Sequence, residues 1–176
     1  MWKAIQSYFF NRAIRKIMNP NRVGKLRNLS DVHTIGLLFI AHSDEQIRQI
    51  KLAASALEKQ QKRVSLLGYI SSLKKNQSPD FPFFTAKDIS FGQVPGGEAV
   101  QSFAGQSFDL LIVTPAAGFL PFTYISQLSA AQLKAGVFDE SSVDCYDFMI
   151  KQGPTDSTRN FIDKLLSYLQ QIDCHG

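Results

Sequence analysis

A chain of 176 residues, 44% of them hydrophobic, is long enough for one globular domain with a sizeable core. No apolar run is long enough to span a membrane, and the N-terminus lacks the apolar core and cleavage site of a signal peptide. Cys145 and Cys174 form neither a disulfide framework nor a metal pair. We therefore expect a cytoplasmic protein with reduced thiols.

The net charge of +4 is distributed unevenly along the chain. Seven basic residues against Asp31 alone give residues 1–33 a net charge of +6, and twelve basic against fourteen acidic residues give residues 34–176 a net charge of −2. The basic residues are Lys3, Arg12, Arg15, Lys16, Arg22, Lys25 and Arg27. They predict a surface that docks on an acidic protein, on nucleic acid or on an anionic membrane.

Residues 2–18 have the pattern of a basic amphipathic helix, which Asn19-Pro20-Asn21 ends. Its apolar stripe is Trp2, Ile5, Phe9, Ala13 and Ile17. One alternative to docking is that this stripe packs on the domain and the charges are a solvated face; another is an organellar transit peptide. We divide the chain into a helix with its connector, residues 1–30, and one α/β domain, residues 31–176.

The segment from Thr34 to Ile70 has the pattern of a strand, a crossover helix and a parallel strand. TIGLLFI is continuously apolar, which is typical of a strand covered on both faces. Ser43 and Gln46 form a capping box at the start of the helix, and VSLLGYI is the second strand. A connection of this length predicts a right-handed parallel pair.

The rest of the chain continues the alternation of strands and helices. We expect strands at 83–85 (an edge), 108–113, 133–138 and 145–150, and helices at 99–103, from Pro121 onward and at 157–172. These elements predict a three-layer, Rossmann-like α/β domain with a mostly parallel sheet of five or six strands. The expected strand order is 3-2-1-4-5-6, with a flavodoxin-like order as the alternative.

Ligands of such sheets bind beyond the carboxyl ends of the strands, near the point where the strand order reverses. The candidate crevice there consists of His42, Ser43, Asp44, Ser71, Thr114 and Gly118. His42 precedes a helix N-terminus at this edge, which suits acid–base or ligand work. A solvated loop histidine is the simpler interpretation.

Cofactor and catalytic motifs are missing. The first strand–helix turn, IAHSDEQ, has no glycine and carries two acids that would repel a pyrophosphate, so we expect no NAD or FAD. There is no phosphate-binding loop, no G-x-S-x-G and no metal-ligand spacing among the histidines and cysteines, so we expect no cofactor and no metal.

Three further features have simple interpretations. Asp139, Glu140, Asp144 and Asp147 are an acidic cluster that we interpret as a solvated rim, with divalent-ion binding as the alternative. Cys145 is expected to be a buried, inert thiol within the strand at 145–150. Phe81, Phe83, Phe84 and Phe91 would form a homodimer surface if they were exposed, whereas burial is the simpler expectation.

The phrases TIGLLFIAHSDEQ, LEKQQKRVSLLGYI, FPFFTAKDISFG, FDLLIV, LSAAQLKAGVFDE and CYDFMI resemble an uncharacterised family of Bacteroidetes bacteria, known only as a domain of unknown function. FDLLIV and LSAAQLKAGVF are also distantly similar to the amino-terminal half of heptosyltransferase-type glycosyltransferases. That resemblance implies a Rossmann-like fold. The sugar-nucleotide site of those enzymes lies largely in a second, carboxyl-terminal domain. This sequence has no room for such a domain, so we expect no transferase activity.

Two functions remain in view. We favour a non-enzymatic binding or adaptor domain whose basic arm, residues 1–30, docks on an acidic partner, since it accounts for the charge asymmetry and the missing catalytic motifs. The alternative is a small enzyme or a binder of a small molecule, such as a nucleotide or sugar-nucleotide, that uses the crevice at the strand ends.

Overall fold

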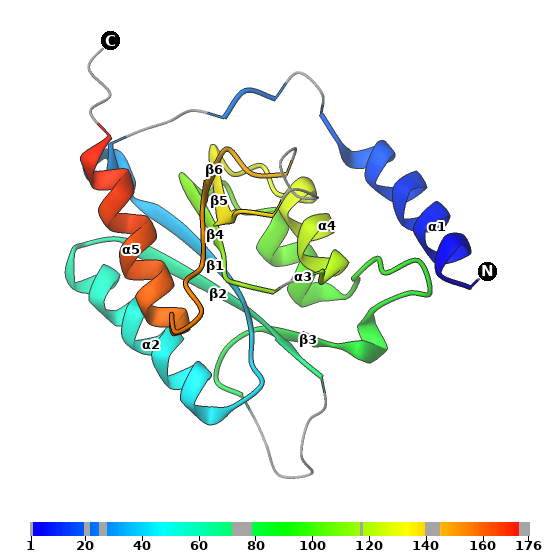
Figure 1. Cartoon of the computed structure of the whole chain (residues 1–176), viewed down its shortest axis with the longest axis horizontal. Helices are drawn as coiled ribbons and strands as arrows, with labels where there is room; N and C mark the ends of the chain where they lie inside the picture. Colours follow the sequence, from blue (N-terminus) through cyan, green and yellow to red (C-terminus); the bar gives the residue numbers. More distant parts are fainter. Residues whose placement is uncertain are drawn as a thin grey trace.

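The structure is a computed structural model that describes residues 2–19, 22–24, 28–71, 79–116, 118–139 and 145–172. Its helices are α1 (Trp2–Ile17), α2 (Asp44–Lys59), α3 (Glu98–Ala104), α4 (Leu120–Leu128) and α5 (Thr158–Gln171), with short 3-10 helices η1 (Leu29–Asp31) and η2 (Ala86–Asp88). Its strands are β1 (Thr34–Ile40), β2 (Arg63–Ile70), β3 (Phe83–Thr85), β4 (Leu110–Val113), β5 (Leu133–Val137) and β6 (Phe148–Ile150). These elements confirm the predicted alternation of strands and helices (Figure 1).

The six strands form one sheet in the order β3-β2-β1-β4-β5-β6, and every neighbouring pair is parallel. In register, Leu37 of β1 lies opposite Leu66 of β2 and Ile112 of β4. The chain therefore winds outward from β1 in one direction as far as β3, and then continues on the other side of β1 with β4. The predicted Rossmann-like order is confirmed, and the flavodoxin-like alternative is wrong.

Helices cover both faces of the sheet (Figure 1). On one face, Leu37 and Phe39 pack in a cluster with residues of α2 and α5; on the other face, Leu38 packs with residues of α3 and α4. Because successive side chains of a strand point to opposite faces, burial on both sides requires an unbroken apolar run. This explains the composition of β1, whose five central residues are all buried.

Side chains define several of the element boundaries. Ser43 caps α2 by accepting a hydrogen bond from the Gln46 N–H at 3.2 Å, and the Gln46 side chain accepts one from the His42 N–H at 3.0 Å. Asp109 accepts the N–H groups of His33 and Thr34, both at 3.0 Å. Its carboxylate thus bridges to the start of β1, and β4 begins one residue later, at Leu110, rather than at 108 as predicted.

An aspartate carboxylate that accepts a backbone N–H group also marks the start of the last strand. Asp147 accepts the backbone N–H of Lys134 at 2.7 Å, and β6 pairs with β5 only from Phe148 onward. The predicted strand at 145–150 is therefore too long by three residues. Cys145 lies in the turn before β6 and is half-buried, so its expected place inside a strand is wrong.

Helix α1 forms an outer layer beyond α4, on the side of the sheet that α3 and α4 cover (Figure 1). The helix is confirmed, but its predicted buried stripe is wrong. Trp2 is 75% exposed and Phe9 48% exposed, whereas Phe10 is the one fully buried residue of the helix. Apolar side chains occupy more than one face of α1, and the face against α4 is the one that carries Phe10.

Candidate functional site

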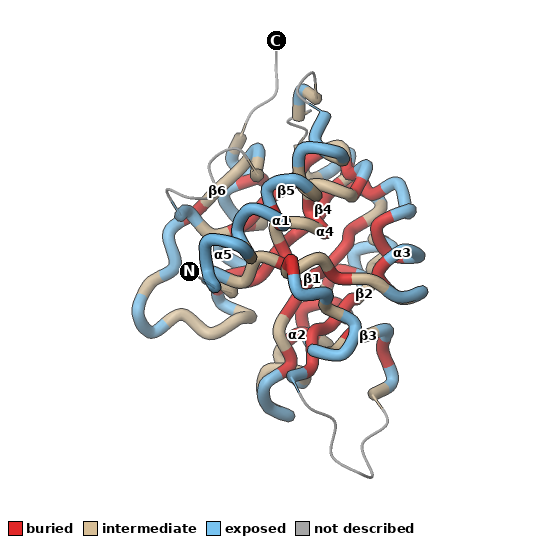
Figure 2. The backbone as a smooth tube through the Cα atoms, turned by 90° about the vertical axis from the view of Figure 1, so that its right-hand side faces the viewer, coloured by how far each residue is buried: buried red, intermediate tan, exposed pale blue. Residues whose placement is uncertain are grey.

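The contact of α1 with the domain includes one buried ring and one hydrogen bond to the backbone. Phe10 is 5% exposed, and Gln6 donates a hydrogen bond from Nε2 to the Phe91 carbonyl at 3.1 Å. Gly92 lets the helix approach, because a Cβ there would lie 3.0 Å from the Cβ of Phe9. Figure 2 shows the consequence: the tube of α1 is largely exposed around one buried segment. Most of this helix surface therefore faces solvent.

Three rings that we call the aromatic cluster, Trp2, Phe9 and Phe91, gather beside α1. The centroid of Phe91 lies 5.2 Å from that of Trp2 and 6.2 Å from that of Phe9. All three rings remain substantially exposed, Phe91 at 47%. This cluster joins α1 to the turn after β3, which contains Phe91, and presents apolar surface to solvent rather than to the core.

Four cations, Lys3, Arg12, Arg15 and Lys16, are exposed on α1. At 3.6 residues per turn Lys3 lies half a turn around the helix from Arg12, so we give the name basic face to Arg12, Arg15 and Lys16. The helix contains no acidic residue. The other three predicted docking cations differ from these. Arg22 is engaged in an ion pair with Asp147 at 2.7 Å, with its side chain only 24% exposed. Lys25 and Arg27 lie outside the described residues.

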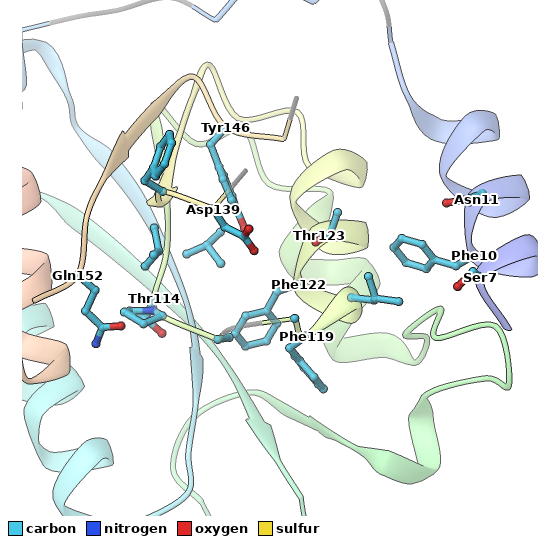
Figure 3. Close-up of a pocket in the computed structure, with 17 residues that line it drawn as sticks. Ser7, Phe10, Asn11, Thr114, Phe119, Phe122, Thr123, Asp139, Tyr146 and Gln152 are labelled. Carbon is cyan, nitrogen blue, oxygen red and sulfur yellow. The ribbon is translucent and has the colours of Figure 1, made fainter. Parts of the chain in front are cut away.

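A pocket of about 530 Å³ opens between α1, α4 and the carboxyl ends of β4 and β5 (Figure 3). Volumes of this order are typical of small-molecule sites. Helix α1 contributes Ser7, Phe10 and Asn11 on one side, and Thr114 continues β4 on the other. The described lining residues are Ser7, Phe10, Asn11, Val113, Thr114, Pro115, Ala116, Gly118, Phe119, Leu120, Phe122, Thr123, Val137, Phe138, Asp139, Tyr146 and Gln152.

Tyr146 and Asp139 lie together at one end of this pocket (Figure 3). The hydroxyl end of the Tyr146 ring lies close to Gly136 of β5, where a Cβ would stand 3.0 Å from Cζ of the ring. Burial raises the pKa of the Tyr146 phenol well above its usual range, and the negative charges of Cys145 and Asp139 add to the shift. The phenol is therefore a protonated hydrogen-bond donor at neutral pH.

The predicted crevice residues separate into two groups. Thr114 and Gly118 line the pocket, Thr114 at 3% exposure. His42 and Ser43 are exposed at the N-terminus of α2, where they serve the cap, and they are not among the pocket's described lining residues. Asp44 lies on the outer surface of α2, and Ser71 is exposed at the end of β2. The crevice therefore lies over β4 and β5, displaced from β1.

Sequence reasoning missed the α1 residues of the pocket and also Tyr146 and Gln152. The alternation of strands and helices places residues after β4 at the carboxyl edge, which identified Thr114 and Gly118. Tyr146 precedes β6 instead, and its ring lies against Gly136 of β5. No local pattern in the sequence indicates that contact.

A buried lysine is the second feature that the sequence did not indicate. Lys134 of β5 is 1% exposed. Burial, together with the nearby Arg22 guanidinium, lowers its pKa to about 8, against the opposing influence of Asp147 and Cys145. Lys134 is not among the pocket's described lining residues, so we expect its buried charge to affect the free energy of unfolding rather than ligand binding in the pocket.

The acidic cluster does not assemble within the part of the chain that the structure describes. Asp147 is occupied by Arg22, Asp139 lines the pocket, and Glu140 and Asp144 lie outside the described residues. Among described residues, no group of three or more His, Cys, Asp or Glu side chains could hold a metal ion. Of the phenylalanines considered as a dimer surface, Phe81 and Phe84 are buried.

The fold and these surfaces define an α/β, Rossmann-like domain with an outer helix that borders a pocket at the strand ends. No helix among the described residues is long and apolar enough to cross a membrane. The chain belongs to a family of unknown function, DUF6913, whose model matches residues 6–172. The match includes most of α1, so this helix is part of the family's sequence. A search of curated proteins finds no match.

Proposed function

We propose that this protein is a non-enzymatic binding module that docks on anionic membrane surfaces through α1. The observation that carries the proposal is the seat of α1: the helix buries only Phe10 fully and keeps its basic face in solvent. A helix whose charges only solvated the outside of the domain would be expected to carry both signs. α1 carries cations alone.

The charge supports attachment to anionic lipid. Each Lys or Arg near such a surface contributes about 1 kcal/mol, so the three cations of the basic face contribute about 3 kcal/mol, or roughly a hundredfold in affinity. The attraction falls with salt because the charges are exposed and screened. The expected attachment is therefore peripheral and reversible.

The aromatic cluster supports a membrane rather than nucleic acid. Trp2 is tilted against Phe91 and Phe9 meets Phe91 edge to face, so these rings pack on one another instead of standing apart as separate platforms. Bases stack on open faces. Rings beside cations are instead the composition of helices that lie in the membrane interface, where the rings enter the headgroup region and the cations contact lipid phosphates.

The test is co-sedimentation of the full chain with vesicles of phosphatidylcholine, with and without phosphatidylserine, at two salt concentrations. We expect binding only to the vesicles that contain phosphatidylserine, and weaker binding at high salt. Replacing Arg12, Arg15 and Lys16 by Ala together is expected to reduce affinity by about 100-fold or more. The matched control replaces three exposed cations of the domain, Arg48, Lys59 and Arg63, by Ala and is expected to bind like the wild type.

Three results would overturn the proposal. The first is equal binding to both kinds of vesicle. The second is equal loss in the two triple variants, which would indicate a response to net charge rather than to α1. The third is tighter binding to short duplex DNA or RNA than to the anionic vesicles, which would assign the basic face to nucleic acid.

A further inference from the structure

The pocket beneath α1 has a chemistry of its own, independent of the docking surface. Four phenylalanine rings from three parts of the chain line it: Phe10 of α1, Phe119 and Phe122 at the start of α4, and Phe138 after β5. Phe119 and Phe122 meet edge to face with centroids 5.0 Å apart. Such a wall offers ring faces and edges to a flat apolar group.

The charge on the described lining residues has one sign, while Lys151, which is not among them, places its Nζ 5.7 Å from the centroid of the Phe138 ring. Among the described lining residues Asp139 is the one charged side chain, and none is Lys or Arg. Sites for phosphate or carboxylate ligands use Arg or Lys side chains, glycine-rich loops or free backbone N–H groups. A carboxylate in the wall disfavours an anion instead.

The N-terminus of α4, which borders the pocket, does not replace the missing cations. The Leu120 N–H donates to the Gly118 carbonyl at 3.1 Å, and the Phe122 N–H donates to the Phe119 carbonyl at 3.0 Å. Pro121, between them, has no N–H to offer. The first-turn donors that would hold an anion at a helix start are therefore occupied or missing.

Polar groups in the pocket fit a neutral or cationic ligand. Thr114, Thr123 and Gln152 can both donate and accept hydrogen bonds. Tyr146 carries its phenolic proton at neutral pH, as tyrosine ordinarily does, and burial raises its pKa further. Asp139 beside it can accept a hydrogen bond from an amine, and the phenylalanine rings can hold a cation over their faces.

We propose that this pocket binds an uncharged or cationic organic molecule with an aromatic or otherwise flat apolar body, and that it rejects phosphorylated and carboxylated ligands. Nucleotides and sugar-nucleotides fall outside this class because of their phosphates. The proposal does not rest on membrane docking, because α1 contributes Ser7, Phe10 and Asn11 to the pocket, and Arg12, Arg15 and Lys16 are not among its described lining residues.

The test uses ligand-observed NMR on the full chain with three matched pairs of probes: tryptamine and indole-3-acetate, tyramine and 4-hydroxyphenylacetate, and adenosine and adenosine monophosphate. Within each pair the ring system is shared and the charge differs. We expect saturation transfer to the amine or uncharged member to exceed transfer to the anion by at least severalfold. Measurements are repeated on the variant with Arg12, Arg15 and Lys16 replaced by Ala, so that anions attracted to the basic face are not counted.

Two variants on the same helix locate the binding. Ser7→Phe adds a ring to the mouth of the pocket at an exposed position and is expected to abolish the transfer. Ala4→Phe adds the same ring at an exposed position of α1 that is not among the described lining residues, and it is expected to leave the transfer unchanged. Equal transfer to the anions, transfer that survives Ser7→Phe, or no transfer from any amine or uncharged probe would each overturn the proposal.

Discussion

Arg22 and Asp147, 125 residues apart in the chain, form a two-bond ion pair in which Nη1 and Nη2 of the guanidinium donate to the two carboxylate oxygens at 2.8 and 2.7 Å. Nη2 also donates to the carbonyls of Ala131 and Gln132 at 3.0 and 3.1 Å. This pair ties the connector after α1 to the segment before β6. It turns one of the predicted docking cations into a structural residue.

We predict that Arg22→Ala destabilises the domain by about 2 kcal/mol, since the side chains of the pair are only about a fifth exposed and the change removes the cation beside Asp147 and the Arg22 donor of two backbone carbonyls. Arg22→Lys is expected to recover less than half, because an ammonium cannot reproduce the two parallel bonds. Urea denaturation measures both values.

The control for this prediction is Arg48→Ala. Arg48 pairs with Glu45 on α2, but both side chains are more than half exposed. Its loss should cost at most about 0.5 kcal/mol. Equal costs for Arg22→Ala and Arg48→Ala would show that the buried contacts of Arg22 contribute nothing beyond a surface pair.

From the lowered pKa of Lys134 we predict that the free energy of unfolding rises with pH. In the folded protein its pKa is lowered from 10.5 to about 8, chiefly by burial, so between these values the unfolded chain binds more protons than the folded one. The free energy of unfolding therefore increases as the pH rises, by about 2 kcal/mol from about pH 7.5 to about pH 9.5. Below the folded pKa the lysine is charged in both states and its burial cost is fully present.

Urea denaturation across this range, in the wild type and in Lys134→Met, measures the effect. The variant should lose most of the slope and be more stable than the wild type near neutral pH. Lys59→Met, which removes an exposed lysine of α2, should keep the wild-type slope. A slope that persists in Lys134→Met would assign it to other groups.

Because Phe10 is the one fully buried side chain of α1, we predict that this helix can detach from the domain while the sheet stays folded. Phe10→Ala removes the one fully buried side chain of α1, and we expect the helix to open more readily by roughly 2 kcal/mol, so that its amides exchange about 30-fold faster. Amides of β1 should keep their protection. Hydrogen exchange followed by mass spectrometry separates the two regions.

The matched control is Tyr8→Ala, two residues away on the same helix, where the side chain is 62% exposed. It should leave the exchange of α1 close to that of the wild type. Faster exchange in β1 as well as in α1 would contradict this prediction, because it would make α1 part of the cooperative core.

We predict that position 36 of β1, a glycine, cannot accept even one methyl group without loss of stability. A Cβ at this position would lie 2.8 Å from the ring of Phe108, which is itself buried. Gly36→Ala should destabilise the domain by about 1–3 kcal/mol through overpacking, and the added change Phe108→Leu should restore part of the loss. Gly96→Ala, whose nearest neighbour would be 3.7 Å away, should be nearly neutral in the same denaturation assay.

The layout of the sheet could be predicted because its causes are local. An unbroken apolar run such as Thr34–Ile40 requires cover on both faces, and Ser43 marks the start of the following helix through a cap that the structure confirms. The alternation of strands and helices then predicted a parallel sheet and left two strand orders open, of which the structure has 3-2-1-4-5-6. The ends of β4 and β6 could not be predicted, because Asp109 and Asp147 determine them through bonds to distant backbone groups.

The candidate site could be predicted only in part, for a related reason. Thr114 and Gly118 follow β4, and topology alone brings that segment to the pocket. The face of α1 that packs could not be read from periodicity, since Phe9 and Phe10 are adjacent apolar residues on different faces. The choice of Phe10 depends on where α4 and Phe91 lie, which is tertiary information.

Trp2 is the one tryptophan of the chain, and at 75% exposure in the aromatic cluster it reports directly on whether α1 enters a membrane interface. The most direct measurement is therefore the emission spectrum of the full chain as vesicles are added. We predict a blue shift with vesicles that contain phosphatidylserine, none with phosphatidylcholine alone, and loss of the shift when Arg12, Arg15 and Lys16 are replaced by Ala. An unchanged spectrum at saturating anionic vesicles, or the same shift with both lipids, would contradict docking through the basic face.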